Sequence, residues 1–138
     1  MSAPGKLRLA VLLSGRGSNM LAIARSCREG LIGAQLSAVI SDRPDAPGIA
    51  AARALGLRTS VIDARQYPGR AAFEDALDAA VTYCGAELIA LAGFMRILSA
   101  GFVQRHNGRM LNIHPSLLPR YQGLHTHRRV LEAGEREH

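Results

Sequence analysis

The chain contains few aromatic residues and no long apolar run, and both shortages narrow its possible roles. Its 138 residues include no tryptophan, three phenylalanines and three tyrosines, too few for a platform on which nucleic-acid bases would stack. No apolar segment reaches the about 18 residues that a membrane-spanning helix needs. The first six residues lead into an apolar segment without the hydrophobic core and cleavage site of a signal peptide. We therefore expect a cytoplasmic protein that binds neither membranes nor nucleic acid.

Cysteine and lysine are scarce as well. Cys27 and Cys84 lie in helical apolar patterns and lack the spacing of metal ligands, which predicts packed, reduced thiols without a structural disulfide. Nearly all basic residues are arginine, and they are scattered along a chain whose formal net charge is +6. Scattered arginines usually solvate a surface, but some can attract a small polyanion such as a phosphate or a polycarboxylate.

Strand-like and helix-like apolar patterns alternate along the chain without a repeat, a low-complexity segment or a break in composition. We expect strands at residues 7–13, 36–40, 58–62, 88–92 and 109–114, and helices at residues 18–29, 49–55, 71–84, 99–105 and 126–133. With 48% hydrophobic residues, this alternation predicts a single α/β domain with a doubly wound, mostly parallel, Rossmann-like sheet. Ligands bind such sheets at the carboxyl ends of the strands.

The loop Ser-Gly-Arg-Gly-Ser-Asn at residues 14–19 joins the first expected strand to the first expected helix. Its glycines allow a tight turn, the free N–H groups at the helix start can hold a phosphate, and Ser18 or Asn19 can cap the helix. The loop lacks the lysine of a Walker motif, the G-x-G-x-x-G pattern, and an acidic residue at the expected ribose-binding position. It therefore predicts generic phosphate binding, with a purely structural turn and cap as the alternative.

Asn112 and His114 stand two residues apart at the end of the last expected strand, just before Pro115. Side chains two apart on a strand share a face of the sheet. The amide can donate to an oxygen that gains negative charge, and the imidazole can move a proton near neutral pH, which together suit attack on a carbonyl. A polar strand end with satisfied hydrogen bonds is the alternative interpretation.

Two further segments carry weaker signals. Residues 93–98 follow an expected strand and place flexible backbone and soft apolar side chains where a flat heterocycle could lie, although a core-filling turn fits equally well. His125 and His127 could join His114 around a zinc ion, but helix-borne metal histidines favour a spacing of four and no carboxylate or thiolate completes the set. We therefore expect no metal.

Three blocks of the chain together resemble the phosphoribosylglycinamide formyltransferase family. They are residues 11–19, 92–98 and 112–119, the last continuing through Tyr121 and Gly123 to residues 124–127. The resemblance covers essentially the whole chain. It implies a folate-dependent enzyme of de novo purine biosynthesis that moves a formyl group from 10-formyltetrahydrofolate to the amine of glycinamide ribonucleotide. Methionyl-tRNA formyltransferase and formyltetrahydrofolate hydrolase share the Asn-x-His pair and the Ser-Leu-Leu-Pro turn, but differ in the first loop and after Pro119.

The resemblance also implies roles for single residues. Asn112 would hold the formyl oxygen as it becomes an oxyanion, and His114 would protonate the tetrahedral intermediate without a metal ion. The ribonucleotide phosphate would bind at Gly17, Ser18, Asn19 and Met20. The folate would contact Arg70, Met95, Arg96, Ile97, Leu98 and Asn112. The family's tight turn implies a cis peptide between Leu118 and Pro119.

Members of the resembled family continue past the position of His138 with further strands, a loop over the folate, and an aspartate that raises the pKa of the catalytic histidine. Residues 1–138 therefore correspond to the N-terminal part of a formyltransferase domain, expected as a monomer or a weak homodimer. By themselves these residues are expected to transfer little or no formyl group. The alternative for them is a phosphate-binding module that holds the ribonucleotide without catalysis.

Overall fold

Helices and strands alternate along the chain in a computed structural model that describes residues 6–113. The strands are β1 (Leu7–Leu13), β2 (Ala34–Ser41), β3 (Thr59–Val61), β4 (Leu88–Leu91) and β5 (Met110–Asn112). The helices are α1 (Ser18–Arg28), α2 (Pro47–Ala54), α3 (Arg70–Tyr83) and α4 (Ala100–Arg105), with a short 3-10 helix, η1 (Ala64–Gln66). The expected helix at 126–133, His114 and the expected cis peptide before Pro119 lie outside the described residues.

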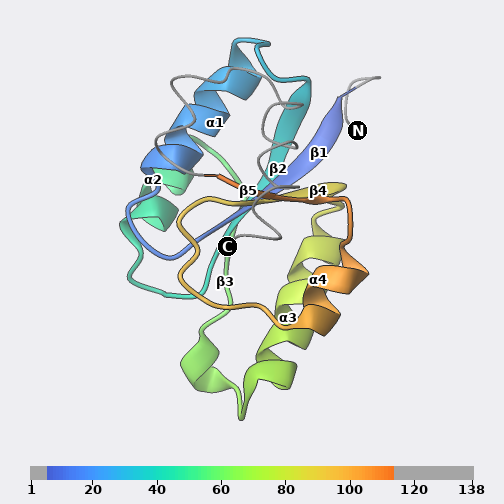
Figure 1. Ribbon diagram of the computed structural model, residues 1–138. Coiled ribbons are helices and arrows are strands. Elements are labelled where there is room, and N and C mark those ends of the chain that lie inside the picture. Colours follow the sequence, from blue (N-terminus) through green and yellow to red (C-terminus); the bar gives the residue numbers. More distant parts are fainter. Residues whose placement is uncertain (1–5, 114–138) are drawn as a thin grey trace.

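The five strands form one sheet in the order β3-β2-β1-β4-β5, and each neighbouring pair is parallel. Helices α1 and α2 cover one face of this sheet, whereas α3 and α4 cover the other (Figure 1). The predicted doubly wound α/β architecture is therefore confirmed. Because both faces are covered, the central strand β1 is a nearly continuous run of apolar residues and does not alternate between apolar and polar residues.

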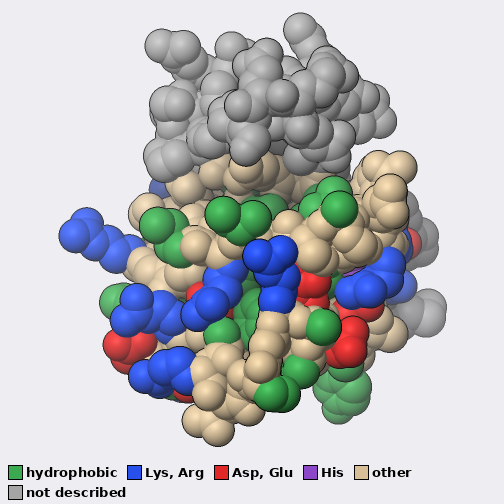
Figure 2. Space-filling view, turned by 60° about the horizontal axis from the view of Figure 1, so that its bottom comes forward, with side chains coloured by type: hydrophobic (Ala, Val, Ile, Leu, Met, Phe, Trp, Pro, Cys, Tyr) green, Lys and Arg blue, Asp and Glu red, His purple; other side chains and the backbone are tan. Residues whose placement is uncertain are grey.

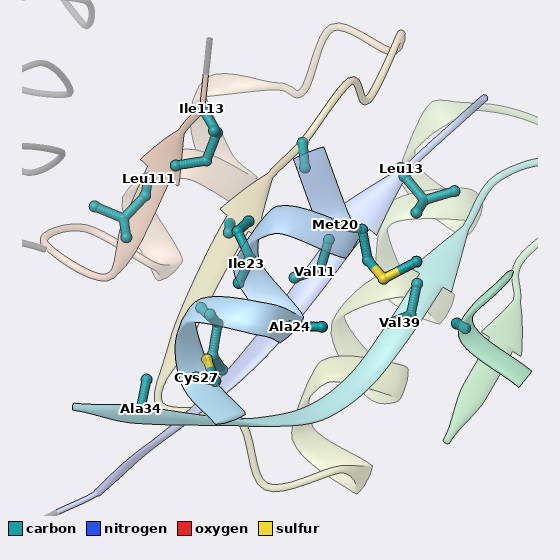
Figure 3. Packing of buried hydrophobic residues seen from close by; sticks show 14 of the residues in the cluster. Val11, Leu13, Met20, Ile23, Ala24, Cys27, Ala34, Val39, Leu111 and Ile113 are labelled. Atoms are coloured by element: carbon teal, nitrogen blue, oxygen red, sulfur yellow. The ribbon is translucent and has the colours of Figure 1, made fainter. Parts of the chain in front are cut away.

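Side chains on β1 alternate between two hydrophobic cores. Val11 and Leu13 belong to the core under α1 and α2, whereas Ala10 and Leu12 belong to the core under α3 and α4. In the first core, Met20 of α1 lies over the sheet between Leu13 and Val39 (Figure 3). Its side chain is fully buried, which stabilises the fold by about 2 kcal/mol.

The observed elements differ from the expected ones mainly at their ends. Strand β2 begins at Ala34, two residues before its predicted start, and α2 begins at Pro47 because proline suits the first helical position. The short helix η1 was not predicted. It begins just after Asp63, whose carboxylate accepts a hydrogen bond from the Arg65 N–H. The spacing of apolar residues does not indicate such a contact.

The two cysteines are free and buried, as the sequence predicts. Cys27 lies in the core under α1 and Cys84 in the core under α3, so the sheet separates them. Burial raises the pKa of the Cys27 thiol, since a thiolate would lose its hydration there. No helix within residues 6–113 is long and apolar enough to cross a membrane.

Candidate functional site

The carboxyl ends of four strands meet at one edge of the sheet, where several of the predicted site residues lie. Ser14 directly follows β1, Asp42 directly follows β2, and the segment 93–98 follows β4. Asn112 is the last residue of β5. Since β1 lies between β2 and β4, segments far apart in the sequence meet around its end, where parallel sheets hold their ligands.

The loop after β1 leads into the N-terminus of α1, but the helix is not capped as predicted. Gly17 occupies the N-cap position with φ +81°, and neither Ser18 nor Asn19 makes a capping hydrogen bond, so that prediction is wrong. The physical reason is a close approach between loops. A Cβ on Gly17 would lie 2.8 Å from the Cα of Gly48, so the chain needs glycine at this turn rather than a capping side chain.

The first turn of α1 nevertheless has the features that phosphate binding requires. The N–H groups of Ser18, Asn19 and Met20 donate to no acceptor within residues 6–113. Ser18 is exposed and Asn19 is half-buried, so both can reach a ligand. Met20 contributes through its backbone, because its side chain is buried in the core. The N-terminus of α1 thus offers several N–H donors to an anion.

A cavity of about 440 Å³ opens between the start of α3 and the segment after β4. It is lined by Ala64, Tyr67, Gly69, Arg70, Phe73, Glu74, Met95, Arg96 and Ile97. Met95 and Ile97 are 81% and 85% exposed, so two large apolar side chains stand at the rim without neighbours within the described chain to cover them. The structure therefore brings four of the predicted folate residues together, namely Arg70, Met95, Arg96 and Ile97.

Leu98 and Asn112 are placed differently from those four. Leu98 packs partly buried against the core under α3 and does not line the cavity. Asn112 is the register partner of Leu91 on β4, and Met110 belongs to the core under α3 and α4. Because side chains alternate along a strand, Asn112 projects from the same face of the sheet as Met110, the face that carries the cavity.

The Asn112 side chain is half-buried and forms no hydrogen bond with any residue in 6–113. An amide in that state keeps both of its N–H groups for a ligand. His114 lies outside the described residues, so the expected meeting of amide and imidazole stays a prediction.

A network of hydrogen bonds that sequence reasoning missed ties the loops at this edge together. The Ser14 hydroxyl donates to Asp42 Oδ1 at 2.6 Å and accepts a hydrogen bond from the Met95 N–H at 2.8 Å. The Arg96 Nε donates to Asp42 Oδ2 at 2.9 Å, and its guanidinium lies 5.5 Å from the centre of the Phe73 ring. Asp42 is 4% exposed, so it is a buried carboxylate with a partner on each oxygen.

Asp42 directly follows β2, the place where a dinucleotide-binding protein holds a ribose, although the spacing from the first loop predicted no acidic residue for that role. The available signal was an aspartate between an apolar strand and a turn-rich run. The sequence does not indicate which side chains Asp42 contacts, because its partner Arg96 is 54 residues away along the chain.

Many of the charged side chains at this edge of the sheet form ion pairs with one another. A smaller cavity of about 170 Å³ is lined by Asp42, Arg43, Pro44, Asp45, Asp63, Arg65 and Arg96. These residues include three ion pairs, Arg43 with Asp45, Arg65 with Asp63 and Arg96 with Asp42. The hydrogen bond from Arg65 holds the pKa of the Asp63 carboxyl below its usual value.

Figure 2 shows Lys and Arg side chains spread over one face, with acidic and apolar side chains among them. Within residues 6–113, no three His, Cys, Asp or Glu side chains form a group that could hold a metal ion.

Comparison with known proteins gives a consistent result. Residues 7–138 match the family described as formyl transferase. The chain is 45% identical over 132 residues to phosphoribosylglycinamide formyltransferase of Escherichia coli K12, covering 96% of this chain and 62% of that protein. It is 46% identical over 129 residues to the human trifunctional purine biosynthetic protein adenosine-3, covering 94% of this chain and 13% of that protein.

Solved structures agree with the sequence matches. The crystal structure of phosphoribosylglycinamide formyltransferase from Brucella melitensis superimposes with a TM-score of 0.77 at 44% identity, covering 94% of this chain and 67% of that one. The corresponding enzyme from Coxiella burnetii gives a TM-score of 0.76 at 45% identity and covers 94% and 61%. The chain thus spans 62% of the length of its E. coli relative.

Proposed function

Because this chain belongs to the formyl transferase family, we propose that the protein transfers a formyl group from 10-formyltetrahydrofolate to the amine of glycinamide ribonucleotide in purine biosynthesis. One observation carries this proposal. The carboxyl edge of a single parallel sheet carries a helix N-terminus whose first N–H groups are unpaired within residues 6–113, a cavity lined by apolar side chains and two arginines, and the amide of Asn112. The identity with the E. coli enzyme over 96% of the chain supports the choice of substrates.

The ribonucleotide phosphate is proposed to bind at the first turn of α1. Backbone N–H groups of Ser18, Asn19 and Met20 would donate to its oxygens, and the positive end of the helix dipole would favour its charge. Gly17 supports this site by turning the chain into the helix.

The folate is proposed to bind in the cavity of about 440 Å³. That volume lies within the range of about 300–1,000 Å³ that small-molecule sites occupy. Met95, Ile97 and Phe73 offer apolar contact to an aromatic ring system, and Arg70 and Arg96 offer guanidinium groups to its carboxylates. We propose that Leu98 supports this segment from the core rather than touching the folate.

The chemistry proposed for the site is transfer without a metal or a covalent intermediate. The amine of the ribonucleotide attacks the formyl carbon, and the carbonyl electron pair moves onto the formyl oxygen, where an Asn112 N–H donates. The attacking nitrogen then loses a proton and the electron pair on the oxygen re-forms the carbonyl. The bond from that carbon to the folate nitrogen breaks, and this nitrogen takes up a proton as tetrahydrofolate leaves. His114 is the proposed proton carrier, since imidazole exchanges protons near neutral pH.

An assay of the full-length protein tests this function. Purified protein with 10-formyltetrahydrofolate and glycinamide ribonucleotide is expected to release tetrahydrofolate only when the ribonucleotide is present. Release with methionyl-tRNA in its place would indicate a methionyl-tRNA formyltransferase, and release with water alone would indicate a hydrolase. Either result, or binding of the ribonucleotide without turnover, would contradict the proposal.

The proposal includes a cytoplasmic location and a monomer or weak homodimer that needs neither nucleic acid nor a membrane. Cell fractionation tests the location. Sedimentation of the purified protein over a range of concentrations tests the oligomeric state.

A further inference from the structure

The segment after β4 is held from behind by two residues that do not line the proposed folate cavity. Ser14 donates its N–H to the Gly93 carbonyl at 3.1 Å, and its hydroxyl accepts from the Met95 N–H at 2.8 Å. The Met95 N–H can act only as a donor, so the Ser14 hydroxyl must direct its own hydrogen elsewhere. It directs that hydrogen to Asp42 Oδ1, at 2.6 Å.

The second oxygen of Asp42 fixes a side chain of the cavity wall. Arg96 Nε donates to Asp42 Oδ2 at 2.9 Å, and the face of Phe73 lies beside the guanidinium. The Arg96 side chain is 45% exposed whereas that of Asp42 is 4% exposed, so a buried carboxylate anchors an arginine that faces solvent. The terminal guanidinium nitrogens of Arg96 make no hydrogen bond within residues 6–113, which leaves them to a ligand.

We propose that Asp42, with Ser14, is a positioning residue that holds Arg96 and the Met95 backbone in the geometry that receives the folate. This inference rests on the proposed function and assigns Asp42 no contact with the substrate. An arginine fixed in advance loses little rotamer freedom when a carboxylate binds to it, so the anchor increases affinity for the folate.

Asp42 also has an electrostatic effect that opposes this gain in affinity. The net effect on folate binding depends on which of the two is larger. The negative charge of Asp42 partly cancels that of Arg96 and so weakens the attraction of an anion. That effect is small where solvent reaches the guanidinium, because water screens charges beyond direct contact. Replacing Asp42 with a neutral residue therefore loses more affinity through the freed Arg96 than it gains through the removed negative charge. Such a replacement is expected to weaken folate binding.

The test compares Asp42→Asn with Asp45→Asn in the full-length protein. Asp45 is on the same loop, is paired with Arg43 and is 72% exposed, so the control removes an equal charge without touching Arg96. Asp42→Asn is expected to raise the KM for 10-formyltetrahydrofolate on the order of 10-fold, as loss of a charged hydrogen bond would. The KM for glycinamide ribonucleotide is expected to stay within about twofold, and the control to match the wild type in both values.

A second background separates positioning from a general loss of structure. In an Arg96→Ala protein, Asp42→Asn is expected to raise the folate KM by no more than about threefold, because only its contact with Ser14, and through it the Met95 backbone, remains. Ser14→Ala keeps the ion pair and releases the Met95 N–H, so it is expected to raise the folate KM about threefold. This variant tests the same network if Asp42→Asn fails to fold.

Other results would overturn the inference. An unchanged or lowered folate KM in Asp42→Asn, or the same 10-fold rise in the Arg96→Ala background, would show that Asp42 does not act by positioning Arg96. Equal changes in both substrates' KM values would indicate a structural role instead. An inactive wild-type protein would contradict the proposed function itself, whereas an active one with an unchanged Asp42→Asn variant would contradict this inference alone.

Discussion

Asn112 is the described residue on which the proposed chemistry depends most directly. Its amide ends β5 without a hydrogen-bonding partner among residues 6–113. We expect Asn112→Ala to lower kcat on the order of 100-fold or more, because an oxyanion would lose a placed donor, with little change in the free energy of unfolding. Steady-state kinetics and urea denaturation measure the two quantities. Asn107→Ala, at an exposed turn, serves as the control, and a kcat for Asn112→Ala within about twofold of the wild type would contradict the role.

Gly17 is required by the backbone, whatever it does for a ligand. A side chain there would force a residue with φ +81° and place Cβ 2.8 Å from the Gly48 Cα. Gly17→Ala is therefore expected to reduce the free energy of unfolding by about 2 kcal/mol or more. Gly17→Val is expected to weaken ribonucleotide binding, but it also damages the fold, so binding must be measured on folded protein.

Gly15 provides the matched control for Gly17. An added Cβ at Gly15 meets no heavy atom within 4 Å, and its φ is not positive. Gly15→Ala is expected to change the free energy of unfolding by less than about 1 kcal/mol, as measured by urea denaturation. Equal losses in the two alanine variants would show that the turn has no special need for glycine at position 17.

At the scale of an element, α4 depends on a buried carboxylate from α3. Ser99 at its N-cap accepts a hydrogen bond from the Phe102 N–H at 3.2 Å. The Ser99 hydroxyl donates to Glu74 at 2.5 Å and its N–H donates to the same carboxylate at 2.7 Å, where Glu74 is 4% exposed. The cap thus joins the two helices that cover one face of the sheet.

Ser99→Ala is expected to reduce the free energy of unfolding by about 1–3 kcal/mol, since it removes a helix cap and one partner of a buried carboxylate. Urea denaturation monitored by circular dichroism measures the loss. Ser26→Ala, inside α1 and without a side-chain hydrogen bond in the described chain, is the control and is expected to be neutral or slightly stabilising. A Ser99→Ala protein as stable as the control would show that the cap contributes nothing.

At the scale of the whole molecule, Cys27 and Cys84 lie on opposite faces of the sheet and report on both cores. Each is 8% exposed. Iodoacetamide labelling followed by mass spectrometry is expected to modify both slowly in the native protein and at one common rate as urea unfolds it, because both cores share one sheet. Labelling of one cysteine at clearly lower urea would show that the two faces unfold separately.

The raised pKa of Cys27 adds a pH dependence to that stability. Since the folded thiol ionises less readily than the unfolded one, its contribution is fully present below the thiol's ordinary pKa and declines as pH rises above it. We expect the free energy of unfolding to fall at alkaline pH less in Cys27→Ala than in the wild type. An identical alkaline slope in both proteins would contradict this linkage.

Much of the architecture could be predicted because apolar periodicity is a local property. The run from Leu7 to Leu13 and the stripe containing Phe73, Leu77 and Val81 mark β1 and α3 whatever lies across from them. Alternation of the two patterns then requires parallel strands with helices on both faces. The sequence also predicted the edge of the sheet at which we propose that ligands bind. The gathering of Arg70 with the segment after β4 was implied by a resemblance rather than by periodicity.

The tertiary structure decided which loops, remote from one another in the sequence, make contact. The sequence determined that residues 14–19 form a glycine turn before a helix, but the approach of Gly48 decided that Gly17, and not Ser18 or Asn19, stands at the cap. The sequence showed an aspartate after β2, but the order of strands decided that its carboxylate meets Ser14 and Arg96. Apolar periodicity determines which face of the sheet a residue occupies. The partner that the residue contacts depends on which strands become neighbours, and this order is established only when the whole sheet assembles.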